Sequence, residues 1–379
     1  MTATEIEDIP EEEEDYSEEG LFETQSWGAD LSFRDILLRY EEGELIKPEI
    51  QRNYVWDKKE AGRFVESLLL GLPIPSIFLA KKGDSYFIVD GFQRITTVND
   101  FVKGIFSSDG TPFKLLNSES IDKRWRGKSF DQLTTSEKRR ILSTTIHTII
   151  FSYNENSKGE DTVLYQVFKR INESGKTLTP QEIRNCVYKG KFNSLLKELN
   201  KNNDWRTLYG FEEDSRMKDL ELILRFFTLS SNPILNSEKT QISLSKELNK
   251  FINSSNDKSD EQLNAFNEDF KNTMSFILNK LGKDAFHNYS KDKEGNLKKE
   301  YVLSNKFHPT IFDAIAISTL QFLRSGRILK SDKLENKRLD LLKNGEFIEA
   351  TSIRTTNLDN IKKRINLASQ YLYGVKNEK

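Results

Sequence analysis

One short segment of this sequence combines residue types that bind phosphate groups. The segment Asp90-Gly-Phe-Gln-Arg94 stands where an apolar run ends and a helical pattern begins. Its glycine, Gly91, lets the backbone approach a ligand, the first-turn amides of a helix carry partial positive charge, and the guanidinium of Arg94 is a fork of donors suited to phosphate oxygens. Asp90 could hold a metal ion or orient a water, and Thr96 and Thr97 add hydroxyls. The set suits a nucleotide phosphate or a nucleic-acid backbone, although Asp-Gly before a helix is also an ordinary capped turn.

A second cluster, Gln51-Arg-Asn-Tyr-Val-Trp56, follows Pro48 and is predicted to be extended. In an extended chain Arg52, Tyr54 and Trp56 face one side and Gln51 the other. An arginine between aromatic rings can stack on bases or contact phosphate. The alternative is structural, with the aromatic rings in the core and Arg52 in a buried ion pair.

The third cluster, Arg170–Asn185, joins a helical pattern, a glycine turn and a capped helix. Thr179-Pro-Gln-Glu182 is a capping box with proline at the first helical position. This order brings Arg170, Asn172, Arg184 and Asn185 into one neighbourhood. A polar helix surface is the alternative for Arg184 and Asn185.

The elements around these clusters predict an α+β protein. Helices are expected over residues 32–40, 57–70 and 93–102, and strands over 76–81, 85–90 and the β-rich stretch 141–153. Residues 107–135 are polar with Gly and Pro and are expected to be an insertion or long loop. We therefore predict a small α/β unit over residues 31–155, followed by a mainly helical domain over 156–379.

Charge is distributed unevenly along the chain. Residues 1–33 hold twelve acidic and no basic side chains, which leaves 57 Lys and Arg against 47 Asp and Glu in residues 34–379, a net charge of +10. Residues 1–30 are predicted to be a disordered acidic tail, and ordered structure is predicted to begin near Leu31. The tail either increases solubility or mimics a nucleic acid and competes with it for the basic body.

Several classes of protein are excluded by composition. One cysteine and three scattered histidines leave no cysteine-rich zinc or iron–sulfur site, and neither haem nor flavin is expected. The acidic start does not resemble a secretory signal, and no apolar run is long enough to cross a membrane. A cytoplasmic protein without a membrane partner is expected.

Taken in order, the clusters resemble the N-terminal domain of GmrSD-type restriction endonucleases over residues ~32–190. The matching stretches are Gln51–Trp56, Leu72-Pro-Ile-Pro75, Asp90–Arg94 with Thr96-Thr97, and Arg170–Asn185. The resemblance implies a ParB/sulfiredoxin-like α/β unit followed by helices, and NTP hydrolysis with Mg²⁺ that licenses DNA cleavage. It also implies that Asp90, Gln93 and Arg94 are catalytic and that Asp90 could bind Mg²⁺. The remaining nucleotide-binding residues would be Gln51, Arg52, Gly91, Thr96, Thr97, Asn172, Arg184 and Asn185.

Two departures from the family pattern bear on activity. Phe92 stands where the family usually has a glutamine, so hydrolysis could be weak even if nucleotide binding survives. No paired histidines follow in the C-terminal half, so no His-Asn-His nuclease module is expected. Either a separate nuclease subunit cuts, or the chain regulates without cutting. The function expected is an NTP-hydrolysing regulatory or sensor component of a restriction or phage-defence system that binds DNA. The alternatives are a non-catalytic DNA-binding module and a metal-dependent ParB-like nuclease.

Overall fold

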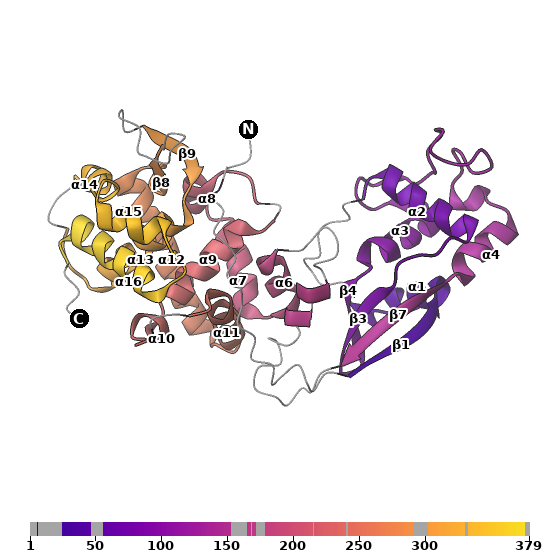
Figure 1. Cartoon of the computed structure of the whole chain (residues 1–379), viewed down its shortest axis with the longest axis horizontal. Helices are drawn as coiled ribbons and strands as arrows, with labels where there is room; N and C mark the ends of the chain where they lie inside the picture. Colours follow the sequence, from indigo (N-terminus) through magenta and orange to yellow (C-terminus); the bar gives the residue numbers. More distant parts are fainter. Residues whose placement is uncertain are drawn as a thin grey trace. The chain divides into compact units, whose positions relative to one another are not determined.

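The computed structural model describes residues 6, 25–46, 56–152, 165–167, 169–171, 179–214, 216–239, 242–290, 302–329 and 333–375. The chain divides into two compact units. One unit is Ser17–Val187, and the other joins Met1–Tyr16 to Tyr188–Lys379. Figure 1 shows a sheet with helices in the first unit and almost only helices in the second. The predicted fold class, an α+β chain whose small α/β unit precedes a helical domain, is confirmed; the predicted domain limits stay predictions.

The first unit is built on a mixed five-stranded sheet with the order β1-β7-β3-β4-β2. The strands are β1 (Gln25–Ser32), β2 (Leu45–Ile46), β3 (Ile77–Lys82), β4 (Ser85–Asp90) and β7 (Thr145–Ser152). The central strands β3 and β7 are parallel, whereas β1 runs antiparallel to β7 and β4 antiparallel to β3. The prediction that order begins near Leu31 is wrong, because β1 starts at Gln25. Its side chains are mostly exposed, so no pattern of buried apolar residues predicts this strand from the sequence. The strand is defined by its backbone pairing with β7.

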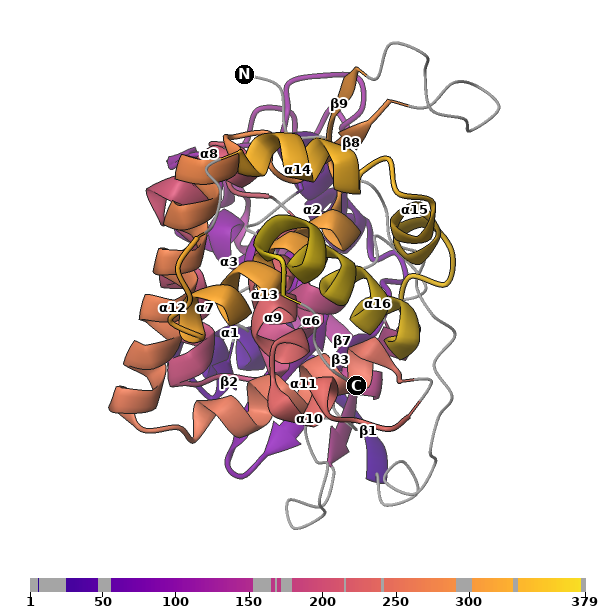
Figure 2. The same cartoon turned by 90° about the vertical axis from the view of Figure 1, so that its left-hand side faces the viewer.

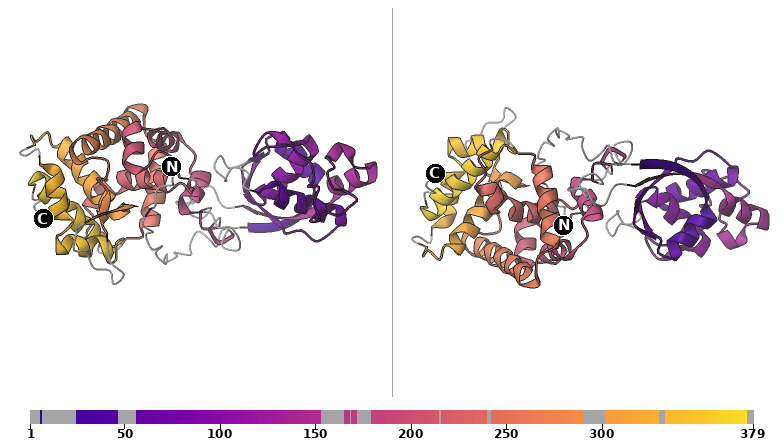
Figure 3. Two further views of the ribbon diagram at one scale, coloured as in Figure 1. Left: turned by 90° about the horizontal axis from the view of Figure 1, so that it is seen from above. Right: turned by 90° about the horizontal axis from the view of Figure 1, so that it is seen from below.

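Helices α1 (Phe33–Glu41), α2 (Lys58–Leu70), α3 (Phe92–Lys103) and α4 (Thr135–Ser143) share one core with the sheet. Alternate residues of β3, such as Ile77 and Leu79, are buried in this core together with Ile95 and Val98 of α3. Figures 1 and 3 show these helices gathered against the strands of the same unit. Burial of these apolar side chains is the main stabilising contribution to the unit.

The ends of α2 are determined by local side-chain chemistry. Asp57 accepts hydrogen bonds from the amides of Lys59 and Glu60, and the Glu60 carboxylate accepts one from the Asp57 amide, which completes a capping box. Gly71 ends the helix in the left-handed conformation with φ of 74°. Both features agree with the prediction from sequence.

The segment 107–135 is irregular, as predicted, yet it is not a solvated insertion. It contains strand β6 (Thr111–Pro112), which pairs with β5 (Ile105–Phe106) just before the segment, and the 3-10 turn η2 (Phe130–Gln132). Phe113, Leu115, Ile121 and Trp125 are buried in the core of the unit. Helix α4 then precedes β7, whereas the sequence predicted strand from residue 141; Thr134 and Glu137 form the capping box that starts this helix.

The second unit is a helical assembly around α13 (Pro309–Arg324), which packs on α9 (Lys218–Leu229), α12 (Asp260–Leu281) and α16 (Leu358–Ala368) (Figure 2). The helices are α7 (Lys191–Asn200), α8 (Asn203–Tyr209), α9 (Lys218–Leu229), α10 (Asn232–Leu235), α11 (Leu244–Asn256), α12 (Asp260–Leu281), α13, α14 (Leu334–Leu341), α15 (Gly345–Ser352) and α16 (Leu358–Ala368), followed by η3 (Ser369–Tyr373). The strands β8 (His287–Tyr289) and β9 (Leu303–Phe307) form a small antiparallel pair. Among the described helices, none is both long enough and apolar enough to cross a bilayer.

A charged cluster lies in the centre of the helical unit. Asp313 of α13 accepts from the Arg225 Nη2 at 2.5 Å and from the Arg364 Nη2 at 2.7 Å, and all three side chains are buried. Arg364 also donates to the backbone carbonyl of Thr355 at 2.6 Å. Two guanidinium groups on one carboxylate join three helices through directed hydrogen bonds.

Candidate functional site

The strand–helix junction from β4 to α3 holds the residues on which the sequence prediction centres. Asp90 is the last residue of β4, and α3 begins at Phe92 directly after Gly91. Opposite, Phe78 pairs with Asp90 and Leu79 with Ile88, so Val89 is an extra residue that forms a β-bulge. A bulge bends its strand and redirects the side chains that follow. Here it determines the direction in which Asp90 leaves the sheet.

Gly91 is required by this junction for two reasons. Its φ of 102° lies in the region that side-chain-bearing residues rarely adopt. A Cβ atom at this position would lie 2.8 Å from the Cβ of Ile77, a residue that is fully buried in β3. Neither the backbone conformation nor the packing at this position therefore accommodates a residue that carries a side chain.

Arg94 is held at the junction by two acceptors. Its Nη2 donates to the Oδ2 of Asp90 at 2.5 Å and to the backbone carbonyl of Ser76 at 2.9 Å. Its Nε is buried and has no hydrogen-bond partner among the described residues. The Arg94 side chain is 13% exposed and that of Asp90 is 43% exposed, so a fixed guanidinium lies beside a carboxylate that faces solvent.

The other predicted residues of α3 have different surroundings. Gln93 accepts a hydrogen bond from the Trp56 amide at 3.3 Å, which ties the junction to the start of α2. The Thr97 hydroxyl donates to the Gln93 carbonyl at 2.7 Å, and the side chain is buried. Thr96 is 5% exposed, and its hydroxyl has no partner among the described residues. Thr96 leaves the helix roughly 200° around the axis from Arg94, so the two do not face one ligand.

Phe92 belongs to the hydrophobic core and is 4% exposed. The ring fills space between helix and sheet at the first position of α3. This burial gives a packing reason for an apolar residue at this position.

The predicted site residues outside the junction are only partly described. Gln51, Arg52 and Asn172 lie outside the described residues. Arg184 and Asn185 are on α6 (Pro180–Val187) and are buried. The Arg184 Nη1 donates to the Gln181 Oε1 at 3.4 Å, and the guanidinium lies over the Tyr165 ring at 5.6 Å. Their role in closing a nucleotide site stays a prediction.

Sequence reasoning did not find three contributors to the junction. The Ser76 carbonyl, the Trp56 amide and the bulge at Val89 all act through the backbone. Backbone groups are present at every residue, so no residue type marks them. The close approach of the Ile77 side chain to the junction is indicated in the sequence only indirectly, by the glycine at position 91.

The donor set at the junction fits a magnesium-bound phosphate better than a protein-only metal cage. Within the described part of the chain, no three His, Cys, Asp or Glu side chains come together as a metal site. Mg²⁺ commonly uses one or two carboxylates with substrate phosphates and waters. One solvent-facing carboxylate, Asp90, beside the Arg94 guanidinium is compatible with that arrangement.

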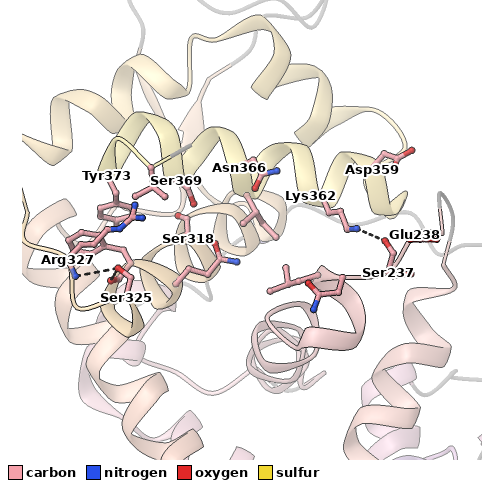
Figure 4. A pocket seen from close by; sticks show the side chains of 16 residues that line it. Ser237, Glu238, Ser318, Ser325, Arg327, Asp359, Lys362, Asn366, Ser369 and Tyr373 are labelled. Carbon is pink, nitrogen blue, oxygen red and sulfur yellow. Dashed lines mark hydrogen bonds between the residues drawn. The ribbon is translucent and has the colours of Figure 1, made fainter. Parts of the chain in front are cut away.

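A separate pocket lies in the helical unit and contains none of the predicted site residues. It has a volume of about 940 Å³ and lies between α10, α13 and α16 (Figure 4). Several of its polar groups bond to nearby backbone: Ser318 and Ser325 donate to helix carbonyls, and the Lys362 Nζ donates to the Ser237 carbonyl at 2.5 Å. These three side chains therefore have hydrogen-bond partners within the protein.

Comparison with known proteins gives one finding. Residues 33–189 match the family model described as "GmrSD restriction endonuclease, N-terminal domain". Neither a curated protein nor a solved structure matches the chain. The matched range contains α1 to α4, the β4–α3 junction and α6. Residues 33–189 are thus a GmrSD restriction endonuclease N-terminal domain, the domain of a restriction or phage-defence component.

Proposed function

We propose that this chain binds a nucleoside triphosphate at the β4–α3 junction and hydrolyses it as the regulatory or sensor component of a restriction system. The observation that carries the proposal is the arrangement of Arg94: its Nη2 is fixed by Asp90 and Ser76, while its Nε remains buried without a partner among the described residues. An unpartnered buried donor is costly, and a phosphate oxygen is a strong acceptor for guanidinium groups.

The neighbouring groups support the same ligand. The start of a helix favours negative charge, and α3 begins directly after Asp90 and Gly91. Asp90 is the residue that would hold Mg²⁺, which when bound neutralises phosphate charge and polarises the phosphoryl group. Arg94 would orient the phosphate, and Gln93 would keep α2 against the junction through the Trp56 amide.

The proposal includes the absence of a nuclease module of the His-Asn-His type. His147 lies on β7 and contacts Asp30, with 2.8 Å between Nδ1 and Oδ1. In the helical unit His308 bonds to the Ser304 hydroxyl at 3.1 Å. Cleavage would then require a separate nuclease subunit.

A nuclease at this same junction has weaker support. Several carboxylates must converge for two-metal hydrolysis. Asp84 is at the opposite end of β4, a strand of 6 residues, which spans roughly 20 Å. Asp100 is buried in α3 and accepts from the Ser107 amide at 2.8 Å. Incubating supercoiled plasmid with the protein and Mg²⁺ or Mn²⁺ tests this alternative directly, and nicking lost in Asp90→Asn would support it.

The decisive experiment is phosphate release from ATP, GTP, CTP and UTP with Mg²⁺, with and without duplex DNA. Asp90→Asn and Arg94→Gln are expected to abolish turnover. Lys103→Gln, at the other end of α3 in an exposed ion pair with Glu41, is the matched control and should keep it. No turnover by the wild type, together with no nucleotide binding by calorimetry, would refute the proposal and favour a non-catalytic DNA-binding module.

A further inference from the structure

Three segments of the sheet-containing unit form one continuous surface. The Asp122 amide donates to the Glu66 Oε1 at 2.6 Å, which ties residues 121–128 to α2. The Trp125 Nε1 donates to the Glu137 Oε1 at 2.6 Å, which ties the same residues to α4. We call this surface, made of α2, residues 121–128 and α4, the basic face.

A further contact joins the two helices of the basic face directly. Arg140 of α4 reaches the end of α2, where a Cβ on Gly71 would lie 2.9 Å from its Nη2. The three segments are therefore linked pairwise.

All four acidic side chains of the basic face are engaged in local contacts. Glu60 caps α2, and Glu66 accepts from the Asp122 amide. Asp122 forms two hydrogen bonds with the Arg124 guanidinium, and these hold the pKa of Asp122 down at about 2. Glu137 accepts from Trp125 and caps α4. Four carboxylates thus serve backbone amides, an indole or one guanidinium.

Apart from Arg124, which pairs with Asp122, the exposed cations of the basic face have no acidic partner among the described residues. These five cations have no carboxylate oxygen within 4.0 Å among the described residues: Lys59, Arg63, Lys123, Arg139 and Arg140. Unpaired cations repel one another and attract a polyanion. Five exposed cations on three linked segments favour a ligand that carries repeated negative charge.

We propose that the basic face binds the phosphate backbone of duplex DNA. Helix α2 has 13 residues, so it is about 20 Å long and could lie along roughly ten charges of a duplex. The inference rests on the restriction role of the domain and is independent of nucleotide hydrolysis.

The aromatic residues of the basic face favour a duplex over a single strand. Proteins that hold single strands stack bases on exposed aromatic rings. Trp125 is 3% exposed, and Arg124 lies over its ring with 4.4 Å to the centroid. Phe130, beneath Lys138, is also buried. Both rings are buried beneath cationic side chains, so nucleic-acid bases cannot stack on them.

The test measures DNA binding against salt in the full chain, without nucleotide. Anisotropy of a fluorescein-labelled 30-base-pair duplex would be followed between 50 and 200 mM NaCl. Five phosphate contacts predict a slope of log K against log salt of about −4.5, which is a loss of roughly 500-fold in affinity over that range. Arg139→Gln with Arg140→Gln should flatten the slope by about 1.8.

The matched control removes two cations that already have acidic partners. Arg39 pairs with Glu44 at 3.2 Å and Lys103 with Glu41 at 3.0 Å, so Arg39→Gln with Lys103→Gln changes the net charge equally and should leave the slope within about 0.5 of the wild type. Arg63→Gln with Lys123→Gln provides a second variant of the basic face, on different segments.

Three results would overturn the inference. One is wild-type protein that does not bind duplex DNA in a salt-dependent manner, and another is an equal effect of the control and both basic-face variants. The third is tighter binding of single-stranded RNA of the same length. Phosphate release by the basic-face variants should equal that of the wild type. If the wild-type chain binds DNA but releases no phosphate, the nucleotide proposal is contradicted and the basic-face inference is not.

Discussion

Replacing Gly91 with alanine should destabilise the sheet-containing unit and misplace the start of α3. Two costs add at this position. An alanine at φ of 102° has a backbone cost, estimated at about 1–2 kcal/mol from left-handed conformations. Its Cβ would also lie 2.8 Å from the Cβ of buried Ile77, and overpacking of this kind costs about 1–3 kcal/mol. The expected loss in the free energy of unfolding is about 2–5 kcal/mol.

The other end of the same helix provides the control for this prediction. Gly104 has φ of 75° and nothing within 4 Å of an added Cβ. Gly104→Ala should therefore have only the conformational cost, about 1–2 kcal/mol. The difference between the two variants isolates the steric conflict with Ile77.

Urea-induced unfolding of both variants and the wild type measures this difference. Gly91→Ala should have the lower midpoint, with an unchanged dependence on urea concentration. If the two alanine variants lost equal stability, the close approach of Ile77 to Gly91 would not be a property of the folded protein. The account of the junction would then be refuted, including its reason for a glycine between Asp90 and the helix.

Three further predictions concern other parts of the chain. Asp313→Asn leaves Arg225 and Arg364 buried without a counter-charge and should cost about 3–5 kcal/mol; thermal unfolding with a fall of less than about 1 kcal/mol would contradict the importance of the cluster. Burial lowers the pKa of His287 below its ordinary value despite nearby Asp284, so the folded state binds this proton less readily than the unfolded state. The contribution of neutral His287 to the stability of the fold is therefore complete above about pH 6.5 and is lost as the pH falls below that value. The melting temperature of His287→Gln should fall less than that of the wild type between pH 7.5 and 5.5, and equal falls would exclude His287 as the cause. Deleting residues 1–20 should strengthen binding of duplex DNA at low salt if the acidic tail competes for the basic body, and unchanged affinity would show that the tail acts only on solubility.

The parts of the fold that were predicted correctly are those with local chemical signals. Ser32, Asp57 with Glu60, and Gly71 determine helix ends through hydrogen bonds to residues within four positions, so their spacing is visible in the sequence. The strands before and after the turn at Gly83 also follow from local pattern. The candidate junction was located for the same reason, since Asp90, Gly91 and Arg94 are neighbours in sequence.

The parts that were missed depend on contacts between distant residues. β1 forms because its backbone groups pair with those of β7, and its first four residues are exposed. The segment 107–135 looks polar by composition, but Phe113 and Trp125 reach the core from between its polar residues. The capping box of Thr134 and Glu137 was a usable signal for α4 that the isoleucine-rich stretch after residue 141 obscured.

The parallel pairing of the two central strands has a consequence for the order of folding. β3 meets β4 across a two-residue turn, whereas its other partner comes from far along the chain, with Ile77 opposite Thr148. Closing a loop that long costs roughly 2–3 kcal/mol more than closing a short turn, and distant pairings form slowly. Folding that starts at the β3–β4 hairpin and adds α3 can assemble the turn at Gly91 from local contacts. During synthesis, the candidate phosphate-binding turn could therefore emerge and take shape before β7 and β1 complete the sheet that supports it.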